Sequence, residues 1–139
     1  MGHRYSIEKA EAFKLEGIII ENIIKAGVVL EVEDVRKIKE INLKIAGNKN
    51  YALLVDPQEG SSITDEARAL LASAELAPFN LAKAIVTHTL KQKILGNLYL
   101  QVNKPHVKTR MFTDREKALK WLHSQLNNQA AKELLSVKK

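Results

Sequence analysis

The side chains with the clearest chemical potential in this sequence are Asp56 and His88. A histidine that a carboxylate orients can accept a proton from a hydroxyl group, and Ser61 and Ser62 supply hydroxyl groups a few residues after Asp56. The pattern lacks a nucleophile bounded by glycines, and a histidine between threonines or an aspartate before a proline is typical of turns and caps. We therefore expect no catalytic residues and a non-enzymatic protein; an enzyme that uses Asp56 and His88 is the less favoured alternative.

The sequence offers no recognisable set of metal ligands. Its four histidines, His3, His88, His106 and His123, are scattered along the chain, whereas zinc sites repeat their ligands at short, paired spacings. The absence of cysteine excludes disulfides, thiol catalysis and thiolate ligands. We expect neither a resident metal ion nor a cofactor.

The composition indicates an ordinary globular domain. The 139 residues suffice for one hydrophobic core, and 45% of them are hydrophobic and 27% charged. The formal charge of +6 is spread along the chain without a nucleic-acid-binding motif, so we do not expect nucleic acid as a partner. No apolar run approaches the roughly 18 residues of a membrane span, and residues 1–13 lack the apolar core of a secretory signal. We expect a cytoplasmic protein without a membrane span.

A buried strand over residues 51–55 is the centre of the expected fold, because its unbroken apolar run fits a strand covered on both faces, and Pro57 ends it. The preceding segment, 32–46, repeats apolar residues at helical spacing and is followed by Gly47, which favours a left-handed helix cap. The remaining expected elements are two or three antiparallel strands within 5–30 with a turn at Gly27, helices over 63–74 and 89–102, strands over 80–87 and 107–112, and a last helix from residue 113.

Local signals refine these helices. Thr64 is the expected N-cap of the second helix, and Thr113 with Glu116 forms the capping-box pattern at the start of the last one. Gly96 suggests close packing of the third helix on the sheet, and Trp121 is expected in the core. The side chains expected to be buried are Ala67, Leu70, Leu71 and Ala74 in the second helix, Leu90, Ile94, Leu95, Leu98 and Val102 in the third, and Ala118, Leu119, Leu122 and Leu126 in the last.

Strands that alternate with helices after an antiparallel start predict an α/β fold. We expect a single domain over 1–139 with a mixed sheet whose N-terminal meander is antiparallel, whose later strands are parallel, and which carries about four helices. Its core spans about 5–126, and 127–139 forms a C-terminal helical tail. In such sheets ligands bind beyond the carboxyl ends of the strands. The binding or interaction residues expected at that edge are Asp56, Ser61, Ser62, Thr64, Thr87, His88 and Thr113.

The strand-loop-helix segment YALLVDPQEGSSITDEAR resembles the sulfate-transporter and anti-sigma-factor-antagonist (STAS) fold. Together with AKAIVTHTLKQKILGNLYLQVNKP and KTRMFTDREKALKWL, it is similar to an uncharacterised bacterial group of STAS-like proteins over roughly residues 17–122. The resemblance implies a regulatory or protein-interaction module with a protein partner, and a homodimer. Its working surface is the loop after residue 55, with exposed serines, and the helix that follows.

In regulatory STAS domains, a serine or threonine at the start of this helix is phosphorylated within an Asp-Ser-Ser/Thr-Gly pattern. Ser61, Ser62 and Thr64 occupy the corresponding loop and are the candidate phosphorylation sites, but Asp65 and Glu66 follow them in place of the hydroxyl-glycine pair. These two carboxylates oppose a phosphate at the helix start. The alternative function is that of a small-molecule or lipid carrier, with an apolar cavity lined by Leu70, Ile94, Leu98 or Trp121.

Overall fold

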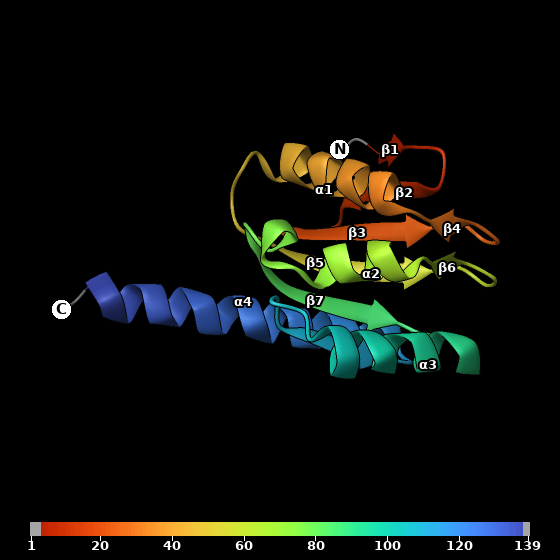
Figure 1. The fold of residues 1–139 in the computed structure, drawn as a ribbon. Helices are drawn as coiled ribbons and strands as arrows, with labels where there is room; N and C mark the ends of the chain where they lie inside the picture. Colours follow the sequence, from red (N-terminus) through yellow and green to blue (C-terminus); the bar gives the residue numbers. More distant parts are fainter. Residues whose placement is uncertain (1–3, 138–139) are drawn as a thin grey trace.

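The computed structural model describes residues 4–137, and an open sheet of six strands lies at its centre (Figure 1). In spatial order these strands are β1 (Arg4–Ser6), β2 (Ala10–Lys14), β3 (Ile19–Ile24), β5 (Tyr51–Pro57), β7 (Asn80–Val86) and β8 (Thr109–Phe112). The pairs β1–β2 and β2–β3 are antiparallel, and every pair from β3 to β8 is parallel. The expected mixed sheet with an antiparallel start is therefore confirmed.

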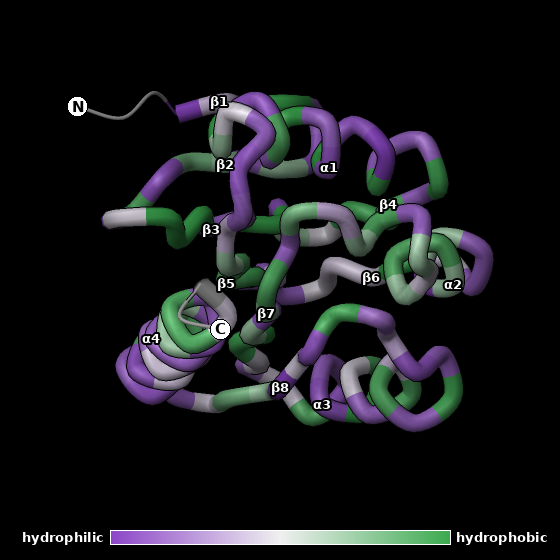
Figure 2. Tube along the Cα trace, turned by 90° about the vertical axis from the view of Figure 1, so that its left-hand side faces the viewer, coloured by the Kyte–Doolittle hydropathy of each residue, from purple (hydrophilic) through white to green (hydrophobic). Residues whose placement is uncertain are grey.

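Helices cover both faces of this sheet. The segments α1 (Val32–Ala46), α2 (Asp65–Ala72) with the short turn η1 (Ala74–Leu76), and α3 (Leu90–Leu98) with the π-helical turn η2 (Tyr99–Asn103) each connect two parallel strands. Because successive parallel strands are added in one direction and such crossovers are right-handed, these helices share one face. The last helix, α4 (Arg115–Val137), covers the opposite face, as the view along the strands shows (Figure 2).

The core under α4 is packed closely because the strands present small side chains there. Ala84 of β7 and Ala118 of α4 are fully buried, together with Ile19, Leu54 and Leu122. Alanine brings the helix backbone near the sheet, and the larger residues fill the space on either side. The expected core face of the last helix is confirmed, and Trp121 packs against this cluster as expected.

Where the signals are local, the predicted elements match the structure. Helix α1 has the expected bounds and ends at Gly47, whose φ of 63° is left-handed. Thr64 caps α2 by accepting a hydrogen bond from the amide of Ala67 at 3.1 Å. Gly27 takes a positive φ of 72°, and a Cβ on Gly96 would collide with the Sδ of Met111, so the turn and the close packing are both confirmed.

The second helix is shorter than expected. Ile63 belongs to a two-residue strand, β6 (Ser62–Ile63), which pairs in parallel with β4 (Val29–Leu30), and α2 ends at Ala72. Ala74 is exposed rather than buried because it lies in η1, beyond the apolar stripe of α2. Strand β5 also continues through Pro57 instead of ending before it, and Pro57 is opposite Ile24 of β3. The amide of Gln58 donates to the carbonyl of Ile24 there, so the missing amide of Pro57 is not needed.

The buried face of α3 differs from the expected one. Leu90, Ile94 and Val102 are 74%, 59% and 66% exposed, whereas Gln92, Gly96 and Tyr99 are buried. Both sets repeat at three- or four-residue spacing, so each fits a helical face. The residues that face the sheet are those on the same side of α3 as Gly96. A glycine at this position leaves room for the side chain of Met111 in β8.

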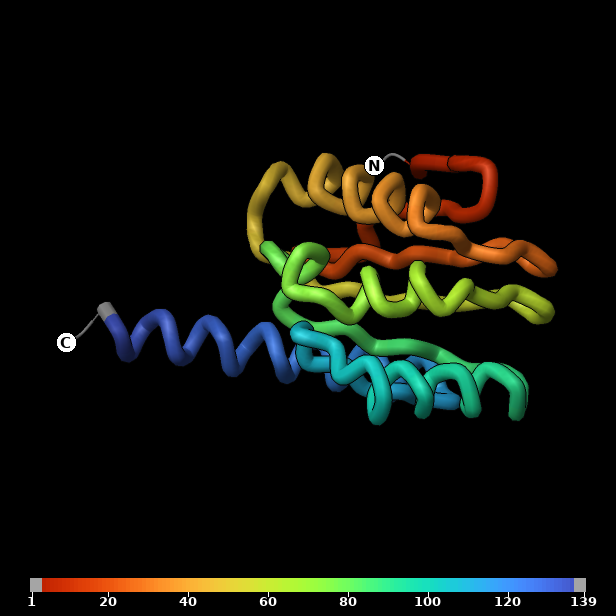
Figure 3. The backbone as a smooth tube through the Cα atoms, in the orientation of Figure 1, coloured from red at the N-terminus to blue at the C-terminus, as the bar shows by residue number. Residues whose placement is uncertain are grey.

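The start and the end of α4 also refine the prediction. Asp114, not Thr113, accepts the hydrogen bond of the first turn, from the amide of Glu116 at 2.9 Å, and Thr113 is exposed. The tail continues α4 as one helix to Val137 and extends beyond the end of the sheet (Figure 3). The last part of the expected tail, 138–139, lies outside the described residues. Among residues 4–137, no helix is both long and apolar enough to cross a bilayer.

Candidate functional site

The carboxyl ends of β5 and β7 bring Asp56 and His88 together. The Nε2 of His88 lies 2.6 Å from the Oδ1 of Asp56, with the aspartate partly buried and the histidine half-exposed. Arg115 at the start of α4 lies on the same side. The hydrogen bonds that Arg115 donates to Glu21 are the main cause of its raised pKa, and the charge of Asp56 contributes less. The pair is therefore a partly exposed hydrogen-bonded contact on the side of the sheet that carries Arg115.

The other expected site residues are divided between the two faces of the sheet. Side chains alternate along a strand, so Asp56 points toward α4, while its neighbours Val55 and Pro57 line a cavity under α2 and α3. Thr87 also lines that cavity, and its hydroxyl donates to the carbonyl of Phe112 at 3.4 Å. Thr113 follows β8 and is exposed. The structure thus joins Asp56 with His88 but separates this pair from the loop hydroxyls.

The loop serines are less exposed than expected. Ser61 is only 6% exposed, and its hydroxyl donates to the carbonyl of Gln58 at 2.7 Å. Ser62 lies in β6 and is half-buried. The expectation of an exposed serine loop is therefore wrong for Ser61, because the pairing of β6 with β4 folds this loop onto the body. Phosphorylation of Ser61, Ser62 or Thr64 stays a prediction.

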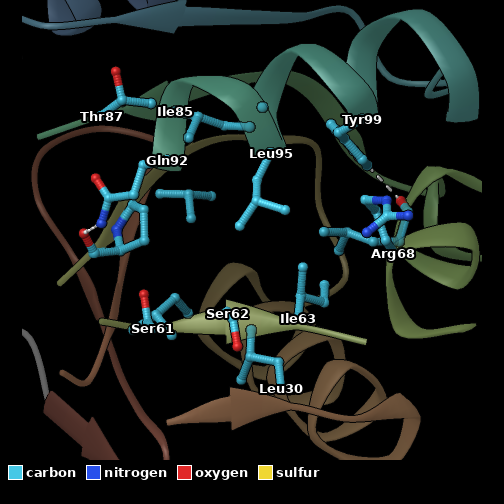
Figure 4. Close-up of a pocket in the computed structure, with 15 residues that line it drawn as sticks. Leu30, Ser61, Ser62, Ile63, Arg68, Ile85, Thr87, Gln92, Leu95 and Tyr99 are labelled. Carbon is cyan, nitrogen blue, oxygen red and sulfur yellow. Dashed lines mark hydrogen bonds between the residues drawn. The ribbon is translucent and has the colours of Figure 1, made fainter. Parts of the chain in front are cut away.

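An apolar cavity of about 120 Å³ lies between the sheet and the helices α2 and α3, beneath the loop that contains Ser61 (Figure 4). Strands contribute Ile24, Val55 and Ile85 to its wall, and Leu71 and Leu95 come from the helices. None of the four residues expected to line a cavity, Leu70, Ile94, Leu98 and Trp121, lines this one. Ile94 points to solvent, and Trp121 belongs to α4, on the other face of the sheet.

Gln92 and Arg68 are the polar side chains that hold the wall of this cavity. The Nε2 of Gln92 donates to the carbonyl of Pro57 at 2.8 Å, and its Oε1 accepts from the amide of His88 at 2.6 Å. Arg68 donates through Nε to the Oδ1 of Asn103 at 2.8 Å. Gln92 therefore fixes α3 to the ends of two strands, and Arg68 fixes α2 to η2.

A second, more polar chamber of about 80 Å³ adjoins the apolar cavity. The two spaces share the lining residues Ile24, Leu30, Val55, Leu71 and Ile85. The polar side chains of the chamber are Asn22, Lys39, Asn42, Tyr51, Asn80 and Lys83. The chamber lies toward α1 and η1, and the apolar cavity lies toward α2 and α3.

Lys83 projects from the middle of β7 into this chamber and is only 3% exposed. Its Nζ forms a hydrogen bond of 3.0 Å with the hydroxyl of Tyr99. Burial, reinforced by the nearby charge of Lys39, lowers the pKa of Lys83 to about 7. Within residues 4–137, neither Lys83 nor Lys39 makes an ion pair.

Lys39 and a pair of asparagines form the α1 side of the chamber. Lys39 donates to the hydroxyl of Tyr51 at 2.9 Å and to the carbonyl of Pro78 at 2.6 Å, and burial lowers the pKa of Lys39 to about 8. The amides of Asn22 and Asn42 exchange two hydrogen bonds of 2.8 and 2.9 Å and join β3 to α1. Burial raises the pKa of the Tyr51 and Tyr99 hydroxyls, so both stay protonated at neutral pH.

Sequence reasoning missed Lys83, although the sequence carried a signal for it. A lysine stands inside the apolar run 81–86, where a strand covered on both faces has no exposed position for a charge. Gln92 and Tyr99 gave no such signal, because polar and aromatic residues are common on helix surfaces. Among the described residues, no group of three potential metal ligands comes together. His88 and His123 each contact a carboxylate, and His3 lies outside the described residues.

The six-stranded mixed sheet, with α1, α2 and α3 on one face and α4 on the other, defines a STAS-like α/β domain. Residues 13–126 match the family described as a domain of unknown function, DUF7793, and the chain belongs to that family. Among solved structures, the chain is similar to an uncharacterised protein of the DUF3478 family from Shewanella loihica PV-4, which has a SpoIIAA-like fold. The two share 16% sequence identity with a TM-score of 0.51 over 88% of this chain and 92% of that one, a likeness that concerns the fold. No curated protein matches the sequence.

Proposed function

We propose that this STAS-like domain is a non-enzymatic module that binds a small, largely apolar molecule between its sheet and the α1–α3 layer. The observation that carries the proposal is the apolar cavity of about 120 Å³ at the carboxyl ends of β5 and β7. Ligands of open α/β sheets bind at this end of the strands. An engineered cavity of about 150 Å³ lined by aliphatic and aromatic side chains binds benzene, so a somewhat smaller space suits an apolar group of at most about six carbon atoms.

The arrangement of the hydroxyl groups supports a binding role over a catalytic one. Asp56 and His88 are close enough for proton transfer, but the hydroxyl of Ser61 is bonded to a backbone carbonyl beneath the opposite face. Within the described residues, no serine or threonine hydroxyl is hydrogen-bonded to His88. A nucleophile and its base need such a contact, so Asp56 and His88 serve here as a hydrogen-bonded pair that joins two strand ends.

The test fills the cavity and measures binding of a neutral probe. Leu95→Phe adds volume at the cavity wall, and Ile94→Phe adds the same volume at the neighbouring exposed position of α3. We expect benzyl alcohol to cause saturable shifts in the amide NMR signals of β7 and α3 in the wild type and in Ile94→Phe, and to lose this effect in Leu95→Phe. Absence of saturable shifts in the wild type contradicts the proposal, as does equal binding by both variants.

A regulatory protein-interaction role is the second candidate, and the exposed side chains of α3 favour it. Leu90 and Ile94 lie one helical turn apart on the outer surface, and both are mostly exposed. Such a pair suits the homodimer that the STAS resemblance implies. Sedimentation of the wild type and of Leu90→Ser/Ile94→Ser distinguishes the outcomes: a dimer that the double substitution converts to a monomer supports this role, and a monomeric wild type at micromolar concentration contradicts it.

A further inference from the structure

We infer that the chamber around Lys83 recognises the carboxylate of the ligand, so that the site takes a small carboxylic acid whose hydrocarbon part fills the apolar cavity. The inference rests on the proposed function, because the apolar cavity holds the remainder of the same molecule. It adds the chemical class of the ligand, its orientation, and the residue that selects it.

The first argument is the incomplete hydrogen bonding of Lys83. An ammonium group has three donors, and within residues 4–137 the hydroxyl of Tyr99 is the one hydrogen-bond partner of the Lys83 ammonium. A buried ammonium without a counter-charge is costly, and an apolar residue would fill this position of β7 without that cost. A carboxylate placed against Lys83 completes its bonding and neutralises its charge.

The second argument is that a second cation faces the same chamber. Lys39 of α1 lines it, and the charge of Lys39 contributes to the lowered pKa of Lys83. The other titratable groups at the site are the hydroxyls of Tyr51 from β5 and Tyr99 from η2, which are neutral. The guanidinium of Arg68, in the wall of the apolar cavity, is paired with Asp65. Two neighbouring cations without a carboxylate from residues 4–137 produce a positive potential inside the fold, and a bound anion relieves it.

Further polar capacity remains unused in the chamber. The Oδ1 of Asn80 is buried and has no hydrogen-bond partner within the described residues. Buried polar atoms are nearly always satisfied by protein, water or ligand. Asn80 lines the chamber together with Lys83. Its Oδ1 accepts hydrogen bonds, as a carboxylate does, so it takes a water molecule that enters with the polar end of the ligand rather than the carboxylate itself.

The two spaces have the right relation for one amphiphilic molecule. They share five aliphatic lining residues, and the hydrogen bond between Lys83 and Tyr99 joins a residue of the chamber to a residue of the apolar cavity. In the proposed complex, one molecule crosses this shared wall, with its carboxylate at Lys83 and its hydrocarbon group beside Leu71 and Ile85. The limited volume of about 120 Å³ favours a short-chain or single-ring acid over a long-chain fatty acid.

Benzoate and benzyl alcohol are the probes that test the inference, because they match in size and differ in charge. With protein refolded from denaturant to remove any co-purified ligand, calorimetric titration at pH 6.5 is expected to give benzoate an affinity at least about ten-fold above that of benzyl alcohol. Lys83→Met is expected to abolish this preference and to retain benzyl alcohol binding. Lys93→Met, which changes an exposed lysine of α3, is the matched control and should behave as the wild type.

The pH profile of the wild type provides a test that needs no variant. Benzoate stays ionised between pH 6.5 and 9, while Lys83 loses its proton in this range, so the affinity for benzoate should fall by about ten-fold or more and that for benzyl alcohol should not change. Binding of benzyl alcohol without a preference for benzoate overturns this inference and leaves the proposed function standing. Binding of neither probe removes both, and acetate that binds as tightly as benzoate refutes the role of the apolar cavity.

Discussion

Replacing Lys83 by methionine should change how the stability of this protein responds to pH. Burial lowers the pKa of Lys83 from 10.5 to about 7 in the folded state. Between these two values the unfolded chain binds a proton that the folded chain does not, so the free energy of unfolding rises with pH in this window. Below about pH 7 Lys83 is protonated in both the folded and the unfolded state. Its contribution to the free energy of unfolding is then constant and at its least favourable value.

The size of this effect follows from linkage. Each pH unit within the window is worth about 1.4 kcal/mol when one proton separates the two states. From pH 6 to pH 9 the protein crosses about two such units, so the wild type should gain roughly 2–3 kcal/mol relative to Lys83→Met. At pH 6 the variant should be the more stable protein, because methionine fills a similar volume without a buried charge.

Urea unfolding followed by far-ultraviolet circular dichroism at pH 6, 7, 8 and 9 measures this difference. Every other titrating group is present in both proteins, so the difference in unfolding free energy between wild type and Lys83→Met isolates Lys83. The exposed Lys93→Met control should show no pH-dependent difference. A difference that stays constant within about 0.5 kcal/mol would refute the reasoning, because Lys83 would then keep its proton in the fold through pH 9.

Other parts of the structure yield further expectations. Arg115→Ala removes the guanidinium that holds the Glu21 carboxylate through two bonds of 2.7 Å, and Glu21 is only 3% exposed, so urea unfolding should show a loss of about 2–4 kcal/mol that Glu21→Gln partly restores. Asn42→Ala leaves the buried amide of Asn22 without its partner and should cost about 1–3 kcal/mol, whereas replacing both asparagines by leucine should cost less. Removal of 127–139 should reduce the helical dichroism signal and leave the melting temperature within a few degrees, because this part of α4 extends beyond the sheet.

Elements set by local chemistry were predictable from the sequence. The bounds of α1 follow from its apolar spacing and from Gly47, and the start of α2 follows from the side chain of Thr64. The parallel direction of the later strands was predictable as well, because a helix follows each buried strand. For these elements, the interactions that decide the structure lie within a few residues of one another in the chain.

The candidate site depends on contacts between distant segments, and this is why much of it was missed. Ser61 is buried because its loop pairs with a segment more than thirty residues earlier. The sequence of α3 has two apolar faces, and the choice of the one with Gly96 depends on Met111 in a later strand. Lys83 was different, since its charge conflicted with the pattern around it. Such a conflict is typical of a functional position.

The short pairing of β4 with β6 forms part of the wall of the apolar cavity, through Leu30, Ser62 and Ile63. The amides of Ser62 and Thr64 donate to the carbonyls of Val28 and Leu30 at 2.9 and 3.0 Å, so the chain leading into α2 is tied to the chain leading into α1. An opening at this point has to break these bonds together or move both loops as one body. In native-state hydrogen exchange, these two amides should therefore exchange at a common rate, and a bound ligand should slow both equally.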